Sequence, residues 1–259
     1  MGWRLNPDYA ELAASFGSLE AVFALDGERL TCDPRSEVIR VTLSGVRYYV
    51  KRYGRGAGLP RNWRQHYGRY LRHGLLNFLP RQRVESEWQN LEHFARWGIP
   101  TAEIVACGLE RRWGMFQRGA LVTRELEGCE DLNCLRLRGD ARLNDRHWVA
   151  GVSARIAAAT RVLHAHRFAH NDLKWRNLLV DAAGRIYFID CPLGAFWHGA
   201  LLRHRQEKDL ATLDKSARLC LSRTQRLRFY LDYRQRERLT PADKAALRRI
   251  LGFFRNERD

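Results

Sequence analysis

The feature that most constrains this chain is a polar stretch at residues 170–177, which reads HNDLKWRN. It follows a segment at 145–166 whose apolar residues recur at helical spacing. It precedes an apolar run at 178–180, a turn at 181–184 and a strand-like segment at 186–189. This order predicts a long helix, a polar loop and two short strands joined by a turn. We expect the arrangement to aim the side chains of Asp172, Asn177 and Asp190 into one space.

The side chains of this loop suit phosphoryl transfer. Asp172 can accept the proton of a hydroxyl group, and Lys174, two residues later, could neutralise charge on a transferred phosphoryl group. Asn177 and Asp190 offer oxygen atoms, the ligands that Mg2+ bound to nucleotide phosphates prefers. We therefore expect Asp172 and Lys174 to be catalytic, and Asn177 and Asp190 to hold a metal ion.

The remaining segments predict an α+β protein with two lobes. Residues 37–43 and 46–53 are rich in β-branched and aromatic residues and are separated by Ser44 and Gly45, which predicts a hairpin. Residues 84–97 have helical spacing and end at Gly98, and residues 120–126 predict an apolar strand. Thr240 begins a further, capped helix. We expect a small strand-rich N-lobe at residues 1–126 and a larger helical C-lobe at residues 127–259.

The loop and its flanking strands also resemble a known catalytic motif. The pattern H-x-D-L-x-x-x-N, followed by an aspartate at the end of a strand, resembles the catalytic loop and metal-binding aspartate of protein-kinase-like folds. The resemblance implies a two-lobed fold that uses ATP and Mg2+. It also implies that Lys51, in the strand at 46–53, pairs with the nucleotide phosphates and that Glu87 orients this lysine. Glu85 lies about 200° from Glu87 around a helix and is the weaker candidate.

Within the kinase-like folds, the chain most closely resembles the bacterial lipopolysaccharide core kinases, the heptose and Kdo kinase family. The resemblance covers residues 20–235 and rests more on the order and spacing of short motifs than on any one of them. These motifs are VKRY at 50–53, EWQNL at 87–91, GIPTA at 98–102, LVTRELEG at 121–128, residues 170–191, KDLATL at 208–213 and LRF at 227–229.

This resemblance implies an ATP-dependent kinase that phosphorylates a heptose or Kdo hydroxyl of the lipopolysaccharide inner core, at the cytosolic face of the inner membrane. Glu125, Leu126 and Glu127 then lie at the hinge that receives adenine through backbone groups. Asp209 then supports the catalytic loop from a helix and does not touch substrate. Because the acceptor is a glycolipid, an anionic membrane surface is an expected partner.

Three departures from the protein-kinase pattern bear on nucleotide binding and regulation. No G-x-G-x-x-G precedes the first strands, so residues 26–36 must cover the phosphates with Gly27 alone. Asn171 stands where an arginine would read a phosphorylated activation loop, and no A-P-E segment follows, which indicates a constitutively active enzyme. Asp190, Cys191 and Pro192 stand where Asp-Phe-Gly would be, which argues against an in-and-out switch.

The charge of the chain points to a polyanionic partner. Lysine and arginine number 45 against 29 acidic residues, which gives a net charge of +16. All but five of these cations are arginines, whose flat guanidinium suits phosphate and carboxylate groups. Nucleic acid, anionic lipid and a phosphorylated sugar are the partner classes that such a balance favours.

Residues 54–83 concentrate this charge. They contain seven arginines and no acidic residue, interleaved with tryptophan, tyrosine, leucine and phenylalanine. The combination suits an anionic membrane surface or a phosphorylated glycolipid. A solvated surface helix whose apolar side packs on the lobe is the alternative. We do not expect a nucleic-acid partner, because the chain as a whole has the pattern of a kinase.

Composition and spacing exclude several other classes. A hydrophobic fraction of 45% excludes a disordered chain, and the longest apolar runs are too short to span a bilayer. No secretory signal is visible, and the six cysteines form no CxxC pair, so we expect a cytosolic protein with reduced thiols. His164, His166 and His170 lack partners at zinc spacing, and we expect His170 to brace the catalytic loop.

Two other functions remain open from the sequence. One is a small-molecule or protein kinase of the same fold. The other is a catalytically silent, basic binding module with a kinase-like fold. Catalytic activity is favoured by the intact set of candidate site residues, which are Lys51, Glu87, Asp172, Asn177 and Asp190. The missing glycine-rich loop keeps a binding module without activity as an alternative. The sequence identifies neither the acceptor sugar nor the oligomeric state.

Overall fold

The computed structural model describes residues 2–33, 36–54 and 82–254. They form two compact units, one made of residues 1–89 and 102–126 and the other of residues 90–101 and 127–259. The expected N-lobe of residues 1–126 differs from this division at residues 90–101, which belong to the second unit. Packing explains the difference: the Phe94 and Phe168 rings lie 5.8 Å apart, and the Asn90 amide donates to the Cys191 carbonyl over 2.7 Å.

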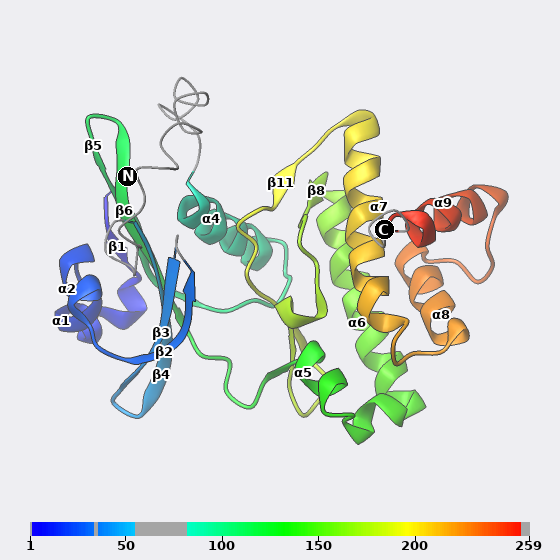
Figure 1. Cartoon of the computed structure of the whole chain (residues 1–259), viewed down its shortest axis with the longest axis horizontal. Helices are drawn as coiled ribbons and strands as arrows, with labels where there is room; N and C mark the ends of the chain where they lie inside the picture. The colour runs from blue at the N-terminus through cyan, green and yellow to red at the C-terminus, as the bar shows by residue number, and fades with distance from the viewer. Residues whose placement is uncertain (1, 34–35, 55–81, 255–259) are drawn as a thin grey trace. The chain divides into compact units, whose positions relative to one another are not determined.

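An antiparallel six-stranded sheet forms the first unit, with strand order β1-β5-β6-β4-β3-β2 (Figure 1). Its strands are β1 (Arg4–Leu5), β2 (Glu28–Asp33), β3 (Ser36–Leu43), β4 (Val46–Gly54), β5 (Ile104–Arg112) and β6 (Met115–Arg124). The helical elements of this unit are η1 (Pro7–Leu12), α1 (Ala13–Phe16), α2 (Leu19–Ala24) and the first half of α4 (Arg83–Arg96).

The β3–β4 hairpin forms as predicted. Its turn residues Ser44 and Gly45 have φ angles of 50° and 79°, the left-handed pair that a two-residue hairpin turn requires. Strand β6 runs from Met115 to Arg124, whereas the sequence predicted a strand at 120–126. The apolar run behind that prediction covers only the buried part of β6, because residues 115–118 are exposed or half-buried.

Side chains alternate along β4, and this alternation gives the sheet two different faces. Tyr48 and Val50 belong to an apolar core that also holds Phe16 of α1 and Val22 of α2. Arg52 follows on the same face and donates from its Nε to the Val22 carbonyl over 3.0 Å. The intervening residues of β4 therefore point to the opposite face of the sheet.

Helix α4 ends where the sequence predicted. Gly98 has a φ of 70°, which a glycine adopts freely after a helix. The backbone N–H groups of Gly98 and Ile99 donate to the carbonyls of Ala95 and Phe94 over 3.1 and 2.9 Å. These bonds satisfy the last carbonyls of the helix and turn the chain away from it.

Helices make up most of the second unit (Figure 1). Its helical elements are the second half of α4, α5 (Leu132–Leu137), η4 (Ala141–Asn144), α6 (Arg146–Ala165), η5 (Trp175–Asn177), α7 (Gly199–Ala217), α8 (Arg223–Arg234) and α9 (Pro241–Gly252). Its strands are β7 (Glu130–Asp131), β8 (Phe168–Ala169), β9 (Leu178–Val180), β10 (Ile186–Phe188) and β11 (Ala195–Phe196), which pair in the orders β10-β9-β7 and β11-β8.

The predicted helix starts are capped by side chains. Asp145 accepts hydrogen bonds from two backbone N–H groups in the first turn of α6. Thr240 and Asp243 form a reciprocal capping box at the start of α9. Ala157 of α6 then packs in one apolar cluster with residues of α7, α8 and α9, among them Leu210. The polar loop at 170–177 therefore starts from a firmly packed helical base.

Across the described parts of the chain, no helix is long and apolar enough to cross a membrane. Most of the basic segment, residues 55–81, lies outside the described residues. Its role as an acceptor site, a membrane contact or a packed surface helix therefore stays a prediction.

Candidate active site

Lys51 and Glu87, both named by the sequence, are in contact in the first unit. The Lys51 ammonium lies 3.1 and 3.0 Å from the two carboxylate oxygens of Glu87. The Glu87 side chain is buried on α4, whereas that of Lys51 is 20% exposed. The ion pair thus holds a cation that a phosphate from solvent can still reach.

Tyr53 completes this group, although the sequence did not single it out. Its hydroxyl donates to the Glu87 carboxylate over 2.6 Å, and its ring lies 5.7 Å from the Lys51 ammonium. Because it follows Lys51 by two residues on β4, both side chains point to one face of the sheet. That spacing of two is the signal in the sequence by which Tyr53 could have been found.

Glu85 has a different partner, as its position around α4 suggested. Its carboxylate lies 3.1 Å from the Arg111 guanidinium of β5. The two glutamates are two residues apart on a helix, which places them on well-separated sides. Of the two glutamates, Glu87 therefore pairs with Lys51, and Glu85 ties α4 to β5.

A strand occupies the stretch that was expected to cover phosphates. β2 pairs with β3 along most of this stretch, and residues 34–35 lie outside the described residues. Gly27 is explained by packing, because a Cβ there would lie 2.6 Å from the Arg40 carbonyl oxygen. The need for glycine at this position thus comes from the close approach to β3.

The expected hinge residues follow β6 directly. The Glu125 backbone N–H donates to the Arg47 carbonyl over 2.9 Å. The Glu125 carboxylate forms an ion pair with Arg47 and accepts from the Tyr49 hydroxyl over 3.0 Å. This N–H and this carboxylate are therefore engaged within the first unit. Adenine recognition by the other backbone groups of Glu125, Leu126 and Glu127 stays a prediction.

In the second unit, Asp172 lies at the centre of a tight loop. Its backbone carbonyl accepts from the Lys174 N–H over 2.8 Å and from the Asn177 side-chain amide over 2.9 Å. Its carboxylate lies 2.6 Å from the Lys174 ammonium and 3.8 Å from the Arg176 guanidinium. The Asp172 side chain is 20% exposed, so a hydroxyl-bearing ligand can reach it. Arg176 was not among the predicted site residues. Its position four residues after Asp172 is the feature of the sequence that could have indicated this contact.

Asn177 and Asp190 lie on neighbouring segments. The Ile189 backbone N–H donates to the Asn177 carbonyl over 3.0 Å, which brings Asp190, one residue later, beside Asn177. The amide nitrogen of Asn177 faces Asp172, with its carboxylate oxygen at 3.4 Å. This orientation turns the amide oxygen of Asn177 away from Asp172.

The donor set of Asn177 and Asp190 fits Mg2+. Among the described residues, no group of three or more His, Cys, Asp or Glu side chains could hold a metal by itself. Mg2+ is instead commonly bound through one or two protein ligands, with waters and substrate phosphates completing the shell. Asn177 and Asp190 would hold the ion, and the bound ion would neutralise phosphate charge.

Asp209 of α7 supports the loop from within the protein. Its side chain is fully buried, and its two carboxylate oxygens accept from the backbone N–H groups of His170 and Asn171 over 2.7 and 2.8 Å. This is the role that the resemblance implied for it. The His170 ring packs near the Phe94 ring, with the ring centroids 6.0 Å apart, and burial lowers the pKa of its imidazole. Its bracing of the loop stays a prediction.

The segment after Asp190 is held at several points. The Asn90 side-chain amide donates to the carbonyls of Cys191 and Gly194 over 2.7 and 3.0 Å. The Asn171 amide donates to the Leu193 carbonyl over 2.8 Å. A Cβ at Gly194 would lie 2.4 Å from the Cys191 sulfur, so only glycine fits there. These contacts fit the expectation that the segment does not swing. Asn90 lies in the EWQNL motif at 87–91, but the sequence analysis assigned it no role of its own.

A hydrogen-bonded chain runs outward from Asp209. The His164 Nε2 lies 3.4 Å from the Asp209 carboxylate, and its Nδ1 lies 2.7 Å from the Tyr233 hydroxyl of α8. Burial raises the pKa of Tyr233, so this hydroxyl keeps its proton beside Nδ1. Asp209 is thereby positioned by two helices besides its own.

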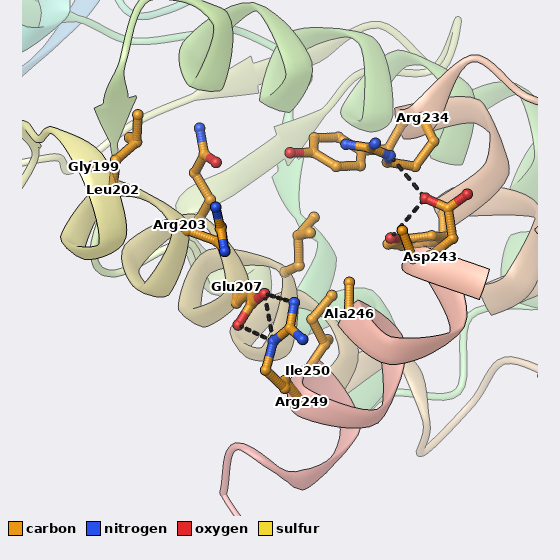
Figure 2. Close-up of a pocket in the computed structure, with 14 residues that line it drawn as sticks. Gly199, Leu202, Arg203, Glu207, Arg234, Asp243, Ala246, Arg249 and Ile250 are labelled. Atoms are coloured by element: carbon orange, nitrogen blue, oxygen red, sulfur yellow. Dashed lines mark hydrogen bonds and ion pairs between the residues drawn. The ribbon is translucent and has the colours of Figure 1, made fainter. Parts of the chain in front are cut away.

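Tyr233 also lines a pocket of about 480 Å³ among α7, α8 and α9 (Figure 2). Two ion pairs occupy it, Arg249 with Glu207 at 2.7 Å and Arg234 with Asp243 at 3.1 Å. None of the predicted catalytic, nucleotide or metal residues lines this pocket. Its charged pairs link α9 to α7 and α8, which fits a structural role.

Sequence comparison supplies the family. The profile of the lipopolysaccharide kinase (Kdo/WaaP) family matches residues 35–250, which is most of the chain. The chain belongs to this family. The family groups phosphotransferases, and the matched range includes the polar loop at residues 170–177.

Two curated relatives are 3-deoxy-D-manno-octulosonic acid (Kdo) kinases from Xylella fastidiosa, strains M12 and 9a5c. Each is 28% identical over 116 residues, which is 44% of this chain and 43% of the relative. The match therefore spans less than half the length of these relatives. Among solved structures, WaaP in complex with acyl carrier protein aligns with a TM-score of 0.70 at 21% identity, over 99% of this chain and 98% of that one. This likeness confirms the expected protein-kinase-like α+β fold.

Proposed function

We propose that this chain is an ATP-dependent kinase that phosphorylates a sugar hydroxyl of the lipopolysaccharide inner core, on Kdo or heptose. The observation that carries the proposal is the loop of the second unit, where Asp172 lies against Lys174 and Asn177, and Asn177 beside Asp190. Membership of the lipopolysaccharide kinase family supports the reaction class. The Kdo kinase relatives favour Kdo as the acceptor.

On this proposal, Asp172 orients the acceptor hydroxyl and takes its proton. The hydroxyl oxygen forms a bond to the γ-phosphorus of ATP, the bond from that phosphorus to the ADP oxygen breaks, and ADP leaves. Lys174 neutralises charge beside Asp172, and Lys51, fixed by Glu87 and Tyr53, binds nucleotide phosphates. Such chemistry depends on positioning and charge, so no covalent intermediate is needed.

Transfer of labelled phosphate from ATP to purified acceptors tests the proposal. One acceptor is a lipid A precursor that carries Kdo alone, and the other is the same precursor extended with heptose. We expect transfer to the Kdo acceptor, whereas transfer only to the extended acceptor would assign heptose. ATP binding in calorimetry without transfer to either would favour another kinase substrate, and no binding of Mg-ATP would favour a silent binding module.

We further propose that the protein works at the cytosolic face of the inner membrane, where a glycolipid acceptor is reached. The net charge of +16 and the basic segment at 54–83 support an anionic membrane surface as a partner. Acyl carrier protein is a second candidate partner, because the structurally similar WaaP was solved in complex with it. Cell fractionation tests the first partner, and co-sedimentation with purified acyl carrier protein tests the second.

A further inference from the structure

The tip of the β5–β6 hairpin exposes large apolar side chains. Trp113 is 77% exposed and Met115 is 48% exposed. The tip is the green loop beside the β5 label in Figure 1, at the end of two long strands of the first unit. Tryptophan normally gains stability from burial, and the Trp113 ring gains little of it at this place.

The turn itself does not favour tryptophan. Arg112 pairs with Met115, and the two residues between them, Trp113 and Gly114, have φ angles of 51° and 76°. A residue with a bulky side chain rarely adopts a positive φ, and asparagine, aspartate or glycine is the usual first residue of such a turn. Trp113 therefore strains the backbone without gaining burial.

A second hairpin of the same sheet shows what the turn alone requires. The β3–β4 turn has nearly the same angles, with φ of 50° at Ser44 and 79° at Gly45. Its first residue is a small polar side chain. The β3–β4 and β5–β6 turns belong to the same sheet and have nearly the same backbone angles. The fold therefore does not require a tryptophan at position 113. The ring is therefore available for a contact beyond the described residues of the first unit.

The charge at the tip indicates what that contact is. Residues 111–119 read RRWGMFQRG, and Arg118 in this stretch pairs with Glu110 and Glu20. Arg111 is bound to Glu85, whereas the exposed Arg112 lies with its guanidinium 4.7 Å from the Trp113 ring. An aromatic ring beside a cation suits the interface between lipid headgroups and acyl chains.

The shape of the tip also favours a bilayer. A two-residue turn is narrow and convex, whereas a stable protein interface needs roughly 800 Å² from each partner. A bilayer accepts a small inserted wedge, because its headgroup region adapts to the wedge.

We propose that the β5–β6 tip is a membrane-docking element. Trp113 inserts at the headgroup level of an anionic bilayer, Met115 lies beside it, and Arg112 binds a lipid phosphate. The proposal rests on the membrane partner of the proposed function and names a site for it, but it does not depend on phosphate transfer. It assigns membrane contact to the described β5–β6 hairpin, which is a different stretch of sequence from the basic segment at 54–83.

Binding to vesicles of phosphatidylcholine, with and without phosphatidylglycerol, tests this element in the full-length protein. Trp113→Asn should lower the partition coefficient on anionic vesicles about ten-fold, because the interfacial ring is lost. Arg112→Gln should lower it about five-fold at low salt, the factor for roughly one cation at an anionic surface. The effect of Arg112→Gln should shrink at high salt. Leu137→Asn is the matched control, because Leu137 is 68% exposed on α5 and should not change binding.

A stability measurement separates docking from a structural role. Trp113→Asn relieves the turn, so its melting temperature should equal or exceed that of the wild type. A lower melting temperature, or anionic vesicle binding equal to the wild type, would overturn the proposal. Loss of acyl carrier protein binding with vesicle binding intact would also overturn it, because the tip would then be a protein contact. Vesicle binding that depends on Trp113 in a protein that transfers no phosphate would uphold the docking element and refute the proposed function.

Discussion

Two of the regions that hold a non-glycine residue at left-handed backbone angles do so in opposite ways. In the catalytic loop region, Asn171 has a φ of 63° and is held through its N–H by Asp209 and through its amide by Leu193. At the β5–β6 tip, Trp113 has a φ of 51° and is mostly exposed.

The difference between Asn171 and Trp113 shows that a left-handed backbone angle can have different roles in different surroundings. A strained residue that buried hydrogen bonds hold in place positions its neighbours for chemistry within the protein. A strained residue at an exposed tip, with no burial to compensate it, gains from contact with a partner. Substitutions in the two regions should therefore separate in their effects on catalysis, stability and binding.

The largest effect on activity is expected at Asp172, in the loop that the buried Asp209 holds in place. Asp172→Ala should lower phosphate transfer by about 10²- to 10⁴-fold, because the acceptor hydroxyl loses its base. ATP binding should stay within a few-fold in calorimetry, since Asp172 acts on the acceptor. Asp190→Ala is the matched variant and should lose both transfer and Mg-ATP binding. Transfer retained by purified Asp172→Ala would refute the assignment.

Substitution of Asp209, which holds the loop in place, should lower both the stability of the protein and its catalytic rate. In Asp209→Asn one oxygen of the buried carboxylate becomes an amide donor, so one of the N–H groups of His170 and Asn171 loses its acceptor. We expect a loss of about 1–3 kcal/mol in the free energy of unfolding and a lower kcat with an unchanged KM for ATP. Urea titration and steady-state kinetics measure the two effects.

The control for Asp209 lies on the same helix. Asp214 pairs with Arg226 over 2.8 Å and is partly exposed, so Asp214→Asn should cost less than about 1 kcal/mol. Equal losses from both substitutions would show that Asp209 is an ordinary ion-pair residue.

His170 should make stability depend on pH. Burial lowers its pKa, although the carboxylates of Asp209, Asp172 and Asp190 oppose this shift. Neither ring nitrogen has a hydrogen-bond partner among the described residues. In the unfolded chain, the His170 imidazole takes up a proton near its ordinary pKa of about 6.5. In the folded protein, the same imidazole stays uncharged until a lower pH. Stability therefore falls as the pH drops below about 6.5, by up to about 1.4 kcal/mol per unit.

His170→Leu tests this dependence by removing the titrating group. The slope of the unfolding free energy against pH, measured by urea titration between about pH 7 and pH 5, should be smaller in the variant. His198→Leu is the control, because His198 is exposed at the surface. An unchanged slope in His170→Leu would assign the pH dependence to other groups.

The smallest effect concerns the two hairpin turns. Ser44→Asn should raise the free energy of unfolding by a few tenths of a kcal/mol, since asparagine tolerates the left-handed angle. Trp113→Asn should give a gain at least as large at the other turn. Thermal unfolding of both variants checks this order. A loss in Trp113→Asn would show that the ring stabilises the fold.

Local signals made much of the fold predictable. The β3–β4 turn, the glycine end of α4 and the capping box of α9 each depend on residues within about four positions, so the sequence shows them directly. The helix, polar loop and two short strands around residues 170–177 were predictable for the same reason. The key residues of this region lie within 21 positions of one another, between two elements with clear periodicity.

Contacts between distant parts of the chain were not predictable in this way. Tyr53 reaches Glu87 over 34 positions, and Asn90 reaches Cys191 over 101. No periodic pattern connects such residues, because the fold alone brings them together. The two-residue strands β8 and β11 also escaped prediction, since alternation has no meaning over two residues.

The hydrogen bonds from Asn90 and Asn171 to residues 191–194 bear on how the activity is regulated in the cell. These hydrogen bonds favour a single conformation of the segment, which agrees with an enzyme that has no in-and-out switch. On the proposed function, output would then follow the number of enzyme molecules and the supply of acceptor. Gene dosage, rather than a molecular switch, would set how many acceptor molecules leave with a phosphate.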